Sequence, residues 1–387
     1  MWTFVSPRIV FGEDALDEIS TIGIRRALIV TDRTIRELGL VDRVTERLDG
    51  TDAEWEVFDG VRPDPDVPTV LAGADVARSL EPDWIVGVGG GSSLDAAKAI
   101  WVLYERPDLR PAEINPFIDL GLRKRARLIT IPTTSGTGAD VTWAIVLTDP
   151  AEKRKMGLGN RENVADVALV DPAMAAGMPP RLTADTGLDA LTHAIEGFTC
   201  TWRTDLTDGL CVHAASDVLE FLPRAVENGA DMEARSRMHH AATSAGLGFG
   251  NAMASIAHAM GHTLGSAFGL PHGRAVGLCL PYTLEFIARE APDRAALLAS
   301  RLGISSAPGE PGARALAAAV RNLAEAIGNP TCVADAGIPS EAFDRTLDKL
   351  VSDAENDTQM ITAARSPSSD ELRALFVTLY DGDAVSF

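Results

Sequence analysis

The stretch DWIVGVGGGSSLDAAK, from Asp83 to Lys98, decides the fold class. Its first part, Asp83 to Gly91, is a short apolar run that ends in glycines, which is typical of a buried strand and the turn after it. The segment that follows, Ser93 to Tyr104, has the apolar spacing of a helix. A strand followed directly by a helix is the unit from which parallel α/β sheets are built.

The same order of elements recurs on both sides of this stretch. An amphipathic helical segment runs from Val67 to Leu80. Further strand-like runs occupy Arg26 to Asp32, Glu54 to Gly60, Arg127 to Thr134, Trp143 to Asp149 and Val164 to Asp171. This alternation predicts an α/β fold with a mostly parallel sheet covered by helices.

The character of the sequence changes after MPPRLTADTG, Met178 to Gly187. From there on, Ala- and Leu-rich segments of helical period dominate, with almost no strand-like run. We therefore predict two domains, an α/β domain at 1–180 and an all-helical domain at 181–387. Helix breaks are expected near Pro223, the turn from Pro271 to Gly273, Pro281, the segment from Pro308 to Gly312, and Asn329 with Pro330.

The length, net charge and cysteine content of the chain limit the kinds of protein that it can be. The chain has 387 residues, enough for two domains with cores of their own, and a formal net charge of -20. That charge argues against nucleic acid as a partner, because phosphates would be repelled. The four cysteines form no C-x-x-C pair, and no run of about 18 apolar residues occurs. With no basic and apolar leader at the N-terminus, we expect a cytoplasmic protein that does not enter a membrane.

Two loops have the composition of cofactor sites. Gly89, Gly90, Gly91 and Ser92 lie between a strand and a helix, where glycines let backbone approach a phosphate and the helix start offers N–H groups. The pattern matches neither a Walker loop nor G-x-G-x-x-G, so a purely structural turn stays open. The second loop, PTTSGTGAD from Pro132 to Asp140, supplies hydroxyls, and two such loops at strand ends favour a shared cofactor.

Asp32, at the end of the first long strand, bears on the choice of cofactor. A carboxylate at this position accepts hydrogen bonds from the ribose hydroxyls of NAD and repels the 2′-phosphate of NADP. An Asx turn or a helix cap is the alternative reading. Arg33 could instead receive the 2′-phosphate, so NADP remains open.

Histidines and one aspartate have the spacing of metal ligands. Asp189 and His193 are four residues apart on a predicted helix, and so are His258 and His262, while His272 follows a turn. Residues at this spacing share a helix face. A set of one carboxylate and imidazoles suits Fe(II), Zn(II), Mn(II), Co(II) or Ni(II). The alternatives for single members are a helix cap at Asp189 and a hydrogen-bonded core histidine at His193.

These residues resemble the iron-containing, or group III, alcohol dehydrogenases, whose superfamily also holds dehydroquinate synthases. The resemblance covers most of the chain and rests on the motifs SPRIVFG, GGGSSLD, PTTSGTGADVT, KMGL, ALVDP, GLDALTHAIEG, GFGNAM, the histidine stretch and GIP near Gly337. It implies a dinucleotide-binding domain followed by a helical metal-binding domain. The implied activity is NAD(P)-linked hydride transfer between a small alcohol and its aldehyde or ketone, with a metal that polarises the substrate oxygen.

The resemblance also implies roles for individual residues. Metal ligands fall on Asp189, His193, His258 and His272, and His262 is the candidate catalytic residue for proton transfer. Cofactor contacts fall on Asp32, Gly89, Gly90, Gly91, Ser92, Asp95, Thr133, Thr134, Thr137, Thr142 and Lys155. The substrate pocket falls on Trp143, Ala144 and Phe249. The family's C-terminal Asn-Pro-Arg segment is not matched, because AARSPSSDEL stands at Ala363 to Leu372.

Fe²⁺ is the expected metal, with Zn²⁺ as the alternative, and NAD the expected cofactor, with NADP open. We also expect a homodimer or higher homo-oligomer. Two other functions compete with the dehydrogenase. One is a dehydroquinate-synthase-like lyase that uses NAD transiently, and the other is a non-catalytic binder of NAD and metal on the same fold. Net NADH production from added alcohols separates the dehydrogenase from the lyase. Binding of NAD without turnover over a panel of alcohols and aldehydes would support the non-catalytic binder.

Overall fold

The structure is a computed structural model that describes residues 3–150 and 154–387. The chain forms two compact units, Met1–Gly177 and Met178–Phe387. Each unit has a hydrophobic core of its own, and the first unit has one core on each face of its sheet.

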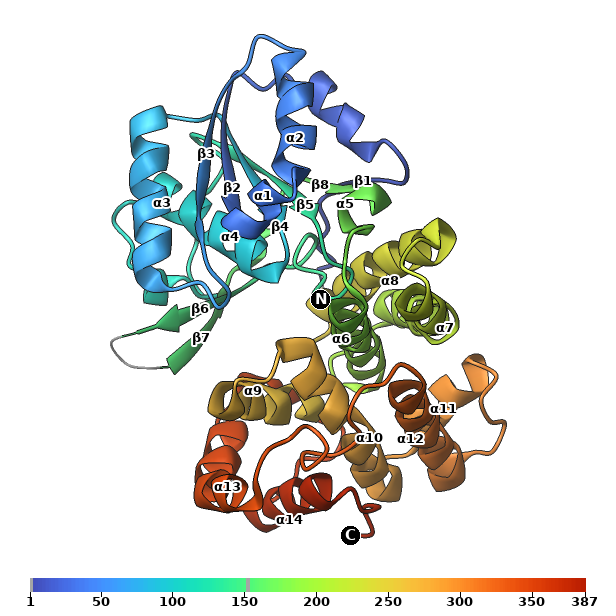
Figure 1. Ribbon diagram of the computed structural model, residues 1–387. Helices are drawn as coiled ribbons and strands as arrows, with labels where there is room; N and C mark the ends of the chain where they lie inside the picture. The colour runs from blue at the N-terminus through green and yellow to red at the C-terminus, as the bar shows by residue number, and fades with distance from the viewer. Residues whose placement is uncertain (1–2, 151–153) are drawn as a thin grey trace. The chain divides into compact units, whose positions relative to one another are not determined.

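The first unit is built on a six-stranded sheet in which every neighbouring pair is parallel (Figure 1). Across the sheet the strands are β1 (Arg8–Phe11), β8 (Val167–Val170), β5 (Arg127–Pro132), β4 (Trp84–Gly89), β2 (Arg26–Asp32) and β3 (Glu54–Val61). The chain moves outward from β2 to β3 and then returns to β4 on the other side of β2. The crevice where the order reverses lies at the carboxyl ends of β2 and β4, where such sheets bind cofactors.

Helices cover both faces of this sheet. The side chains of β2 alternate, so Leu28 and Val30 face a core shared with α3 (Val67–Leu80) and α4 (Gly91–Glu105). Ala27 and Ile29 face the opposite core, which includes residues of η1 (Ala15–Thr21) and α2 (Leu40–Asp49). Figure 1 shows α3 and α2 on opposite sides of the strands. The short elements of this unit are α1 (Arg33–Glu37), η2 (Pro111–Glu113), η3 (Arg161–Asn163) and α5 (Pro172–Ala175).

One predicted strand lies outside the main sheet. The run from Trp143 to Asp149 forms β6 (Ala144–Asp149), which pairs with β7 (Arg154–Gly159) as a separate antiparallel pair. Sequence patterning did not identify β7 or the four-residue edge strand β1. β7 begins with two charged residues, and β1 is too short for an alternation of apolar and polar residues to be recognised.

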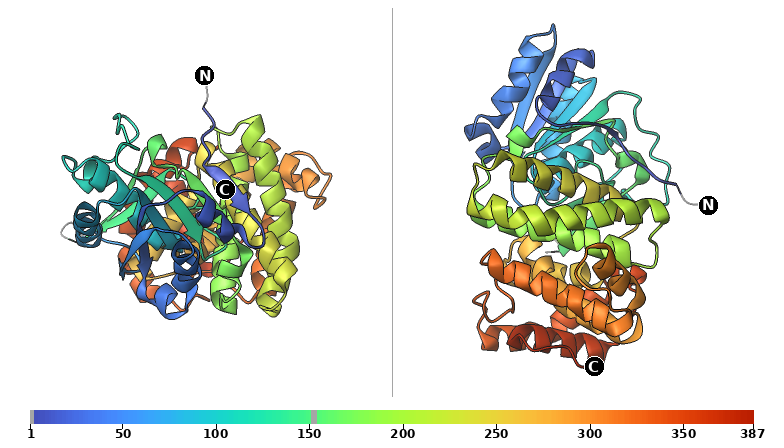
Figure 2. Two further views of the ribbon diagram at one scale, coloured as in Figure 1. Left: turned by 90° about the horizontal axis from the view of Figure 1, so that it is seen from above. Right: turned by 90° about the vertical axis from the view of Figure 1, so that its right-hand side faces the viewer.

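The second unit is helical and contains no strand in its described residues, which run from 178 to 387. Its helices are α6 (Pro180–Thr199), α7 (Asp205–Glu227), α8 (Met232–Asn251), α9 (Ile256–Phe268), α10 (His272–Glu290), α11 (Asp293–Arg301), α12 (Gly309–Ala326), α13 (Ser340–Glu355), η4 (Thr358–Thr362) and α14 (Ser369–Asp381). Helices α7 and α8 lie side by side, as the right-hand view of Figure 2 shows. The predicted fold class, a parallel α/β part followed by an all-helical part, is confirmed.

Two of the predicted helix breaks are wrong. Pro223 lies inside α7 and Pro281 lies inside α10, and both helices continue through the proline. An internal proline costs about 3 kcal/mol, because it removes a hydrogen bond and crowds the preceding turn. Helix α10 is buried at every position from Gly273 to Ala288, so tertiary packing offsets that cost. Helices do end or begin near Pro271, Pro308 and Asn329, as expected.

Packing of α4 against the sheet makes Trp101 a sensitive position. Its side chain is fully buried, and its indole N–H donates to the carbonyl of Ala126 at 3.0 Å. We expect Trp101→Ala to lower the free energy of unfolding by about 3–5 kcal/mol, because it opens a cavity and leaves that carbonyl unpaired. Trp55→Ala, at a half-exposed position on β3, is the matched control and should cost about 1 kcal/mol or less. Urea unfolding of the two variants measures both; equal losses would contradict the assignment of Trp101 to the core.

Candidate metal centre and cofactor loops

The four residues predicted as metal ligands come together in the helical unit. Asp189 and His193 lie on α6, His258 lies in the first turn of α9, and His272 is the first residue of α10. One ligand atom from each lies within 4.8 Å of those of the other three. Asp189 and His193 project from one face of α6 because they are four residues apart. Residues more than eighty positions apart in sequence thus form one cluster.

Close helix packing makes this convergence possible. A Cβ atom at Gly273 would lie 2.2 Å from the carbonyl oxygen of Asp185, so only glycine lets α10 start so close to α6. A Cβ atom at Gly261 would lie 2.6 Å from Cγ1 of Val276, which brings α9 close to α10 in the same way. The glycines therefore set the distances among the helices that carry the cluster.

A buried ion pair fixes the first turn of α10 against α6. The guanidinium of Arg274 donates two hydrogen bonds to the carboxylate of Asp185, at 2.9 and 2.7 Å, and both side chains are buried. Asp185 lies one helical turn before Asp189, and Arg274 lies two residues after His272. A bidentate pair of this kind fixes orientation as well as distance. It aligns the two helix segments that supply a carboxylate and an imidazole to the cluster.

The cluster has the electrostatics of a cation site. Oδ1 of Asp189 and Nε2 of His258 are buried and make no hydrogen bond within the described residues. Burial raises the pKa of Asp189 to about 8, and burial lowers the pKa of His258 to about 3, with the charge of His262 adding to that fall. The imidazoles nearest to Oδ1 of Asp189 are those of His272, with Nε2 at 3.4 Å, and His193, with Nδ1 at 3.7 Å. A buried carboxylate surrounded by imidazoles is a donor set that suits a divalent metal. The residues present therefore fit a metal ion.

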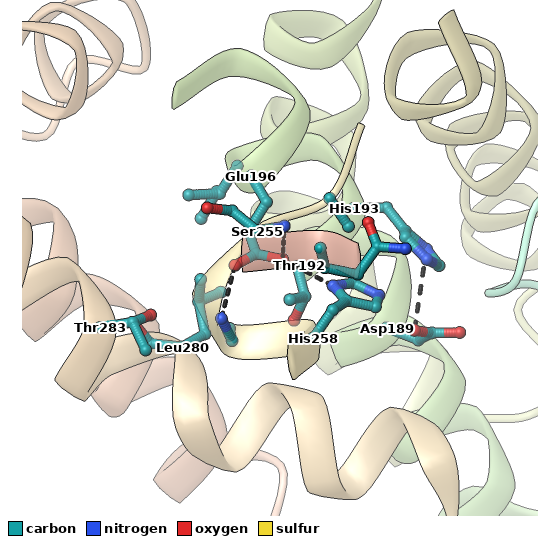
Figure 3. Close-up of polar contacts among 12 residues, drawn as sticks. Asp189, Thr192, His193, Glu196, Ser255, His258, Leu280 and Thr283 are labelled. Carbon is teal, nitrogen blue, oxygen red and sulfur yellow. Dashed lines mark hydrogen bonds and ion pairs between the residues drawn. The ribbon is translucent and has the colours of Figure 1, made fainter. Parts of the chain in front are cut away.

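Glu196 is part of this site and was not identified from the sequence. Its carboxylate is buried and lies 2.6 Å from Nδ1 of His258, and it also accepts from the backbone N–H groups of Ser255 and Ala257 (Figure 3). Burial raises the pKa of Glu196 to about 7, although these hydrogen bonds oppose the rise. Helical spacing within GLDALTHAIEG could have identified Glu196, because it follows His193 by three residues and so lies on the same helix face.

An aromatic ring lies directly against the cluster. Phe249 on α8 stacks on the imidazole of His193, with ring centroids 3.9 Å apart and planes within 10°. This contact fixes the tilt of the His193 ring and places an apolar surface beside the potential ligand atoms. Phe249 was predicted to line the substrate pocket, and the structure places it next to the proposed metal position within the helical unit.

His262 lies near the cluster but is not one of its four members. Its ring centroid is 5.8 Å from that of His258 and 5.4 Å from that of His272. Its Nδ1 lies 2.8 Å from a carboxylate oxygen of Asp357, the residue that precedes η4. Burial raises the pKa of Asp357, but the hydrogen bond and charge of His262, together with the backbone N–H of Gln359, lower it, so that the pKa lies below its ordinary value. Sequence reasoning did not identify Asp357, which is far from the histidines in sequence.

In the first unit, the two predicted cofactor loops touch each other. Gly89 ends β4 with a φ of +150°, and Gly90 and Gly91 begin α4. A Cβ atom at Gly90 would meet Thr134 at 3.2 Å, and one at Gly91 would meet Thr137 at 3.0 Å. No side chain caps the start of α4. The loops therefore form a glycine-lined surface at the carboxyl ends of β4 and β5, with helix N–H groups and hydroxyls available for phosphate.

Asp32 lies beside this surface. One of its carboxylate oxygens caps α1 through the N–H of Ile35, at 3.0 Å, and the other accepts from the hydroxyl of Ser93 at 3.1 Å. A Cβ atom at Gly89 would lie 3.7 Å from Asp32. The helix-cap reading of Asp32 is thus present in the structure, together with a position next to the glycine loop that suits ribose recognition.

The remaining predicted cofactor and substrate residues have varied surroundings. Asp95 is bonded to Lys98 and to the N–H of Val146, so its carboxylate holds α4 against β6. The ammonium of Lys155 pairs with Asp64 at 2.7 Å. Thr133 and Thr142 are buried, and Oγ1 of Thr133 makes no hydrogen bond within the described part of the chain. Ser92, Trp143 and Ala144 are half-buried, and the carbonyl of Ala144 accepts from Lys98.

In the described part of the chain, no helix is both long enough and apolar enough to cross a membrane.

The raised pKa of Asp189 predicts an unusual dependence of stability on pH in the metal-free protein. Unfolding exposes this carboxyl and returns its pKa from about 8 to its ordinary value near 4. The unfolded chain therefore releases a proton that the folded chain keeps, so stability falls as pH rises from about 4 to 8. Asp189→Asn cannot ionise and should lose less stability over that range. Thermal unfolding of both metal-free proteins at pH 5 and pH 8 measures this; parallel losses would contradict it.

Comparison with known proteins agrees with this site. The family of iron-containing alcohol dehydrogenases matches residues 6–172, and the C-terminal family of Fe-containing alcohol dehydrogenases matches residues 183–380. The chain is 36% identical over 390 residues to the NADPH-dependent butanol dehydrogenase of Clostridium saccharobutylicum, with 100% of each protein covered. It spans under half the length of the aldehyde-alcohol dehydrogenases that it also matches.

Solved structures of related oxidoreductases are also similar to this chain. The chain is similar to a 1,3-propanediol oxidoreductase, with a TM-score of 0.91, 31% identity and coverage of 98% of this chain and 100% of the other. It is also similar to the sulfoacetaldehyde reductase of Bifidobacterium kashiwanohense in complex with NAD+, with a TM-score of 0.88, 30% identity and coverage of 99% and 100%. The chain belongs to the iron-containing alcohol dehydrogenase family, a family of metal-dependent oxidoreductases that act on alcohols and aldehydes.

Proposed function

We propose that Asp189, His193, His258 and His272 bind one divalent metal ion, Fe²⁺ or alternatively Zn²⁺, and that the enzyme interconverts a small alcohol and its aldehyde or ketone. The observation that carries this proposal is the convergence of the four side chains, in which Oδ1 of Asp189 and Nε2 of His258 are buried and make no hydrogen bond within the described residues. Membership of the family favours this reaction over the lyase and over the non-catalytic binder.

The bound groups would supply two kinds of chemistry, since the metal is a Lewis acid for the substrate oxygen and the nicotinamide exchanges the hydride. The four residues of the ligand set determine the net charge at the metal site. Asp189 is the one carboxylate of the ligand set, and histidines bind a metal in their neutral form, the form in which burial already keeps His258. The set therefore compensates only half of the charge of a divalent cation, which leaves the site able to stabilise negative charge on a substrate oxygen.

His262 is the proposed route for the proton. The carboxylate of Asp357 can only accept a hydrogen bond, so Nδ1 of His262 carries the hydrogen in that pair. Nε2 of His262 is then the atom that takes up or releases a proton, either directly or through water. Its side chain is about one-third exposed, which leaves a path for exchange with solvent.

For the cofactor, we propose NAD, held by the glycine loop, by the threonine loop and by Asp32. The support is the position of the Asp32 carboxylate beside Gly89. The remaining predicted contacts, at Asp95, Thr142 and Lys155, stay predictions. One similar protein is NADPH-dependent and another was solved with NAD+, so the names of the relatives do not decide the matter.

The substrate proposed is a small, rather apolar primary alcohol or aldehyde. Its support is Phe249, which presents an apolar ring beside His193. A role for Trp143 and Ala144 remains a prediction. We also propose a cofactor domain at 1–180, a metal and substrate domain at 181–387, a cytoplasmic location, and a homodimer or higher homo-oligomer. Four buried free cysteines are compatible with a reducing compartment.

Two histidine variants test the metal and proton roles. We expect His272→Ala, purified in folded form under anaerobic conditions, to lose bound metal and turnover together, because it removes a proposed ligand. His262→Ala should keep its metal while kcat falls by about 10²–10⁴-fold, the usual contribution of a general acid or base. Metal analysis and NADH- and NADPH-linked assays over a panel of alcohols and aldehydes measure both.

Different results would contradict the metal-ligand role of His272 and the proton-transfer role of His262. Full metal content and activity in His272→Ala would refute the four-residue site. Loss of metal in His262→Ala would mean that the proton residue had been confused with a ligand. Cofactor binding and a full metal site in the wild type without turnover on any substrate would favour the non-catalytic binder.

A separate variant tests the choice of cofactor. Asp32→Ala removes the carboxylate that would repel a 2′-phosphate, so we expect the ratio of kcat/KM for NAD to that for NADP to fall by about tenfold or more. Glu37→Ala, at the end of α1, removes a carboxylate elsewhere on the same unit and is the control. If wild type already prefers NADP, or if both variants behave alike, Asp32 does not set the preference.

A further inference from the structure

Helix α9 begins without a cap of its own. The side chain of its N-cap residue, Ser255, makes no capping hydrogen bond. The carboxylate of Glu196, from α6, accepts from the N–H of Ser255 at 2.9 Å and from the N–H of Ala257 at 2.6 Å. A carboxylate at a helix N-terminus satisfies unpaired N–H groups and interacts favourably with the helix dipole. The start of α9 is thus set by a residue sixty positions earlier.

The same carboxylate also contacts His258 and bears on which ring nitrogen of His258 carries the hydrogen. Oε2 of Glu196 lies 2.6 Å from Nδ1 of His258 (Figure 3). In its ionised form the carboxylate of Glu196 can only accept, so Nδ1 then carries the hydrogen and Nε2 keeps its lone pair. That Nε2 atom is buried and makes no hydrogen bond within the described residues, and His258 belongs to the four-residue cluster.

We propose that Glu196 is the positioning residue of the metal centre, selecting Nε2 of His258 as the ligand atom and fixing where α9 begins. This inference rests on the proposed metal site. Both effects come from one side chain, so the tautomer of His258 and the position of its helix are set together. A carboxylate behind a ligand histidine also raises the basicity of that ligand and commonly affects metal affinity by about 10–100-fold.

Glu196 is a poor candidate for a direct ligand. Its Oε1 accepts from Ala257, and its Oε2 accepts from Ser255 and from His258, so both oxygens already serve donors. The competing role is a purely structural cap. A structural cap would stabilise the unit but would have no more effect on metal affinity than any other buried carboxylate of similar importance to the fold.

Glu285 is the matched control for that comparison. It is a buried glutamate of the same helical unit, it accepts from the backbone N–H of Val385 at 2.8 Å, and it pairs with Arg321 at 2.9 Å. None of these contacts involves the histidine cluster. Glu196→Gln and Glu285→Gln each replace a buried, hydrogen-bonded carboxylate by an amide of nearly the same size.

The experiment measures the Kd for Zn²⁺ in the full-length metal-free protein, by competition with a chromophoric chelator. The amide of Glu196→Gln cannot accept from all three donors at once, so we expect zinc affinity to fall by about 10–100-fold. Glu285→Gln should bind zinc within about twofold of wild type, even if it loses as much stability on urea unfolding. Equal zinc affinity in the two variants would overturn the proposal.

A measurement on the wild type keeps the test independent of how the variants fold. Nitrogen NMR of the ¹⁵N-histidine-labelled, metal-free chain reports which nitrogen of His258 bears hydrogen, with His258→Ala identifying the signal. We expect a protonated Nδ1 and an unprotonated Nε2. The opposite tautomer would overturn the proposal.

His258→Ala also separates this inference from the proposed function. If zinc binds His258→Ala as tightly as wild type, the four-residue site itself is wrong. If His258→Ala loses zinc while Glu196→Gln binds it like wild type, the site stands and only the role of Glu196 is wrong.

Discussion

The buried carboxylate of Asp189 is the constraint on which the helical unit depends. Burial raises its pKa to about 8, and its Oδ1 has no hydrogen bond within the described residues, so in the metal-free chain this carboxyl keeps its proton near neutral pH, because a buried charge there is unfavourable. Burial also keeps the neighbouring imidazole of His258 neutral, so that ring supplies no countercharge. A divalent cation would displace the proton and supply the countercharge, so that Asp189 becomes a ligand. Binding of the metal and stability of the fold are therefore linked.

The surrounding structure holds the four potential ligand atoms within 4.8 Å of one another. Gly273 permits the contact between α10 and α6, and the Arg274–Asp185 pair fixes the orientation of these helices. Glu196 and Phe249 then set the rings of His258 and His193. Such preorganisation lowers the cost of binding, because little rearrangement of the ligands remains to be made. Small residues and buried ion pairs beside the site thus serve its chemistry as well as the packing of the fold.

The sequence predicted the fold class from local period, and helical spacing paired Asp189 with His193 and His258 with His262. The choice of Asp189, His193, His258 and His272 as the ligand set came from the resemblance to iron-containing alcohol dehydrogenases. The sequence did not predict that α7 and α10 continue through Pro223 and Pro281, since tertiary packing of the helices decides that. It also did not identify the partners Glu196 and Asp357. Glu196 could have been found by helical spacing, but the contact between His262 and Asp357 joins residues 95 positions apart and depends on tertiary structure.

X-ray absorption at the zinc edge, on the full-length protein loaded with one equivalent of Zn²⁺, tests the central claim most directly. The account predicts a single shell of nitrogen and oxygen ligands at about 2.0–2.2 Å, with the outer-shell scattering of three imidazoles and no sulfur. Substituting Asp189 should remove one oxygen from that shell. A sulfur ligand at about 2.3 Å, or fewer than two imidazoles, would contradict the account, because the zinc would then be bound elsewhere in the protein.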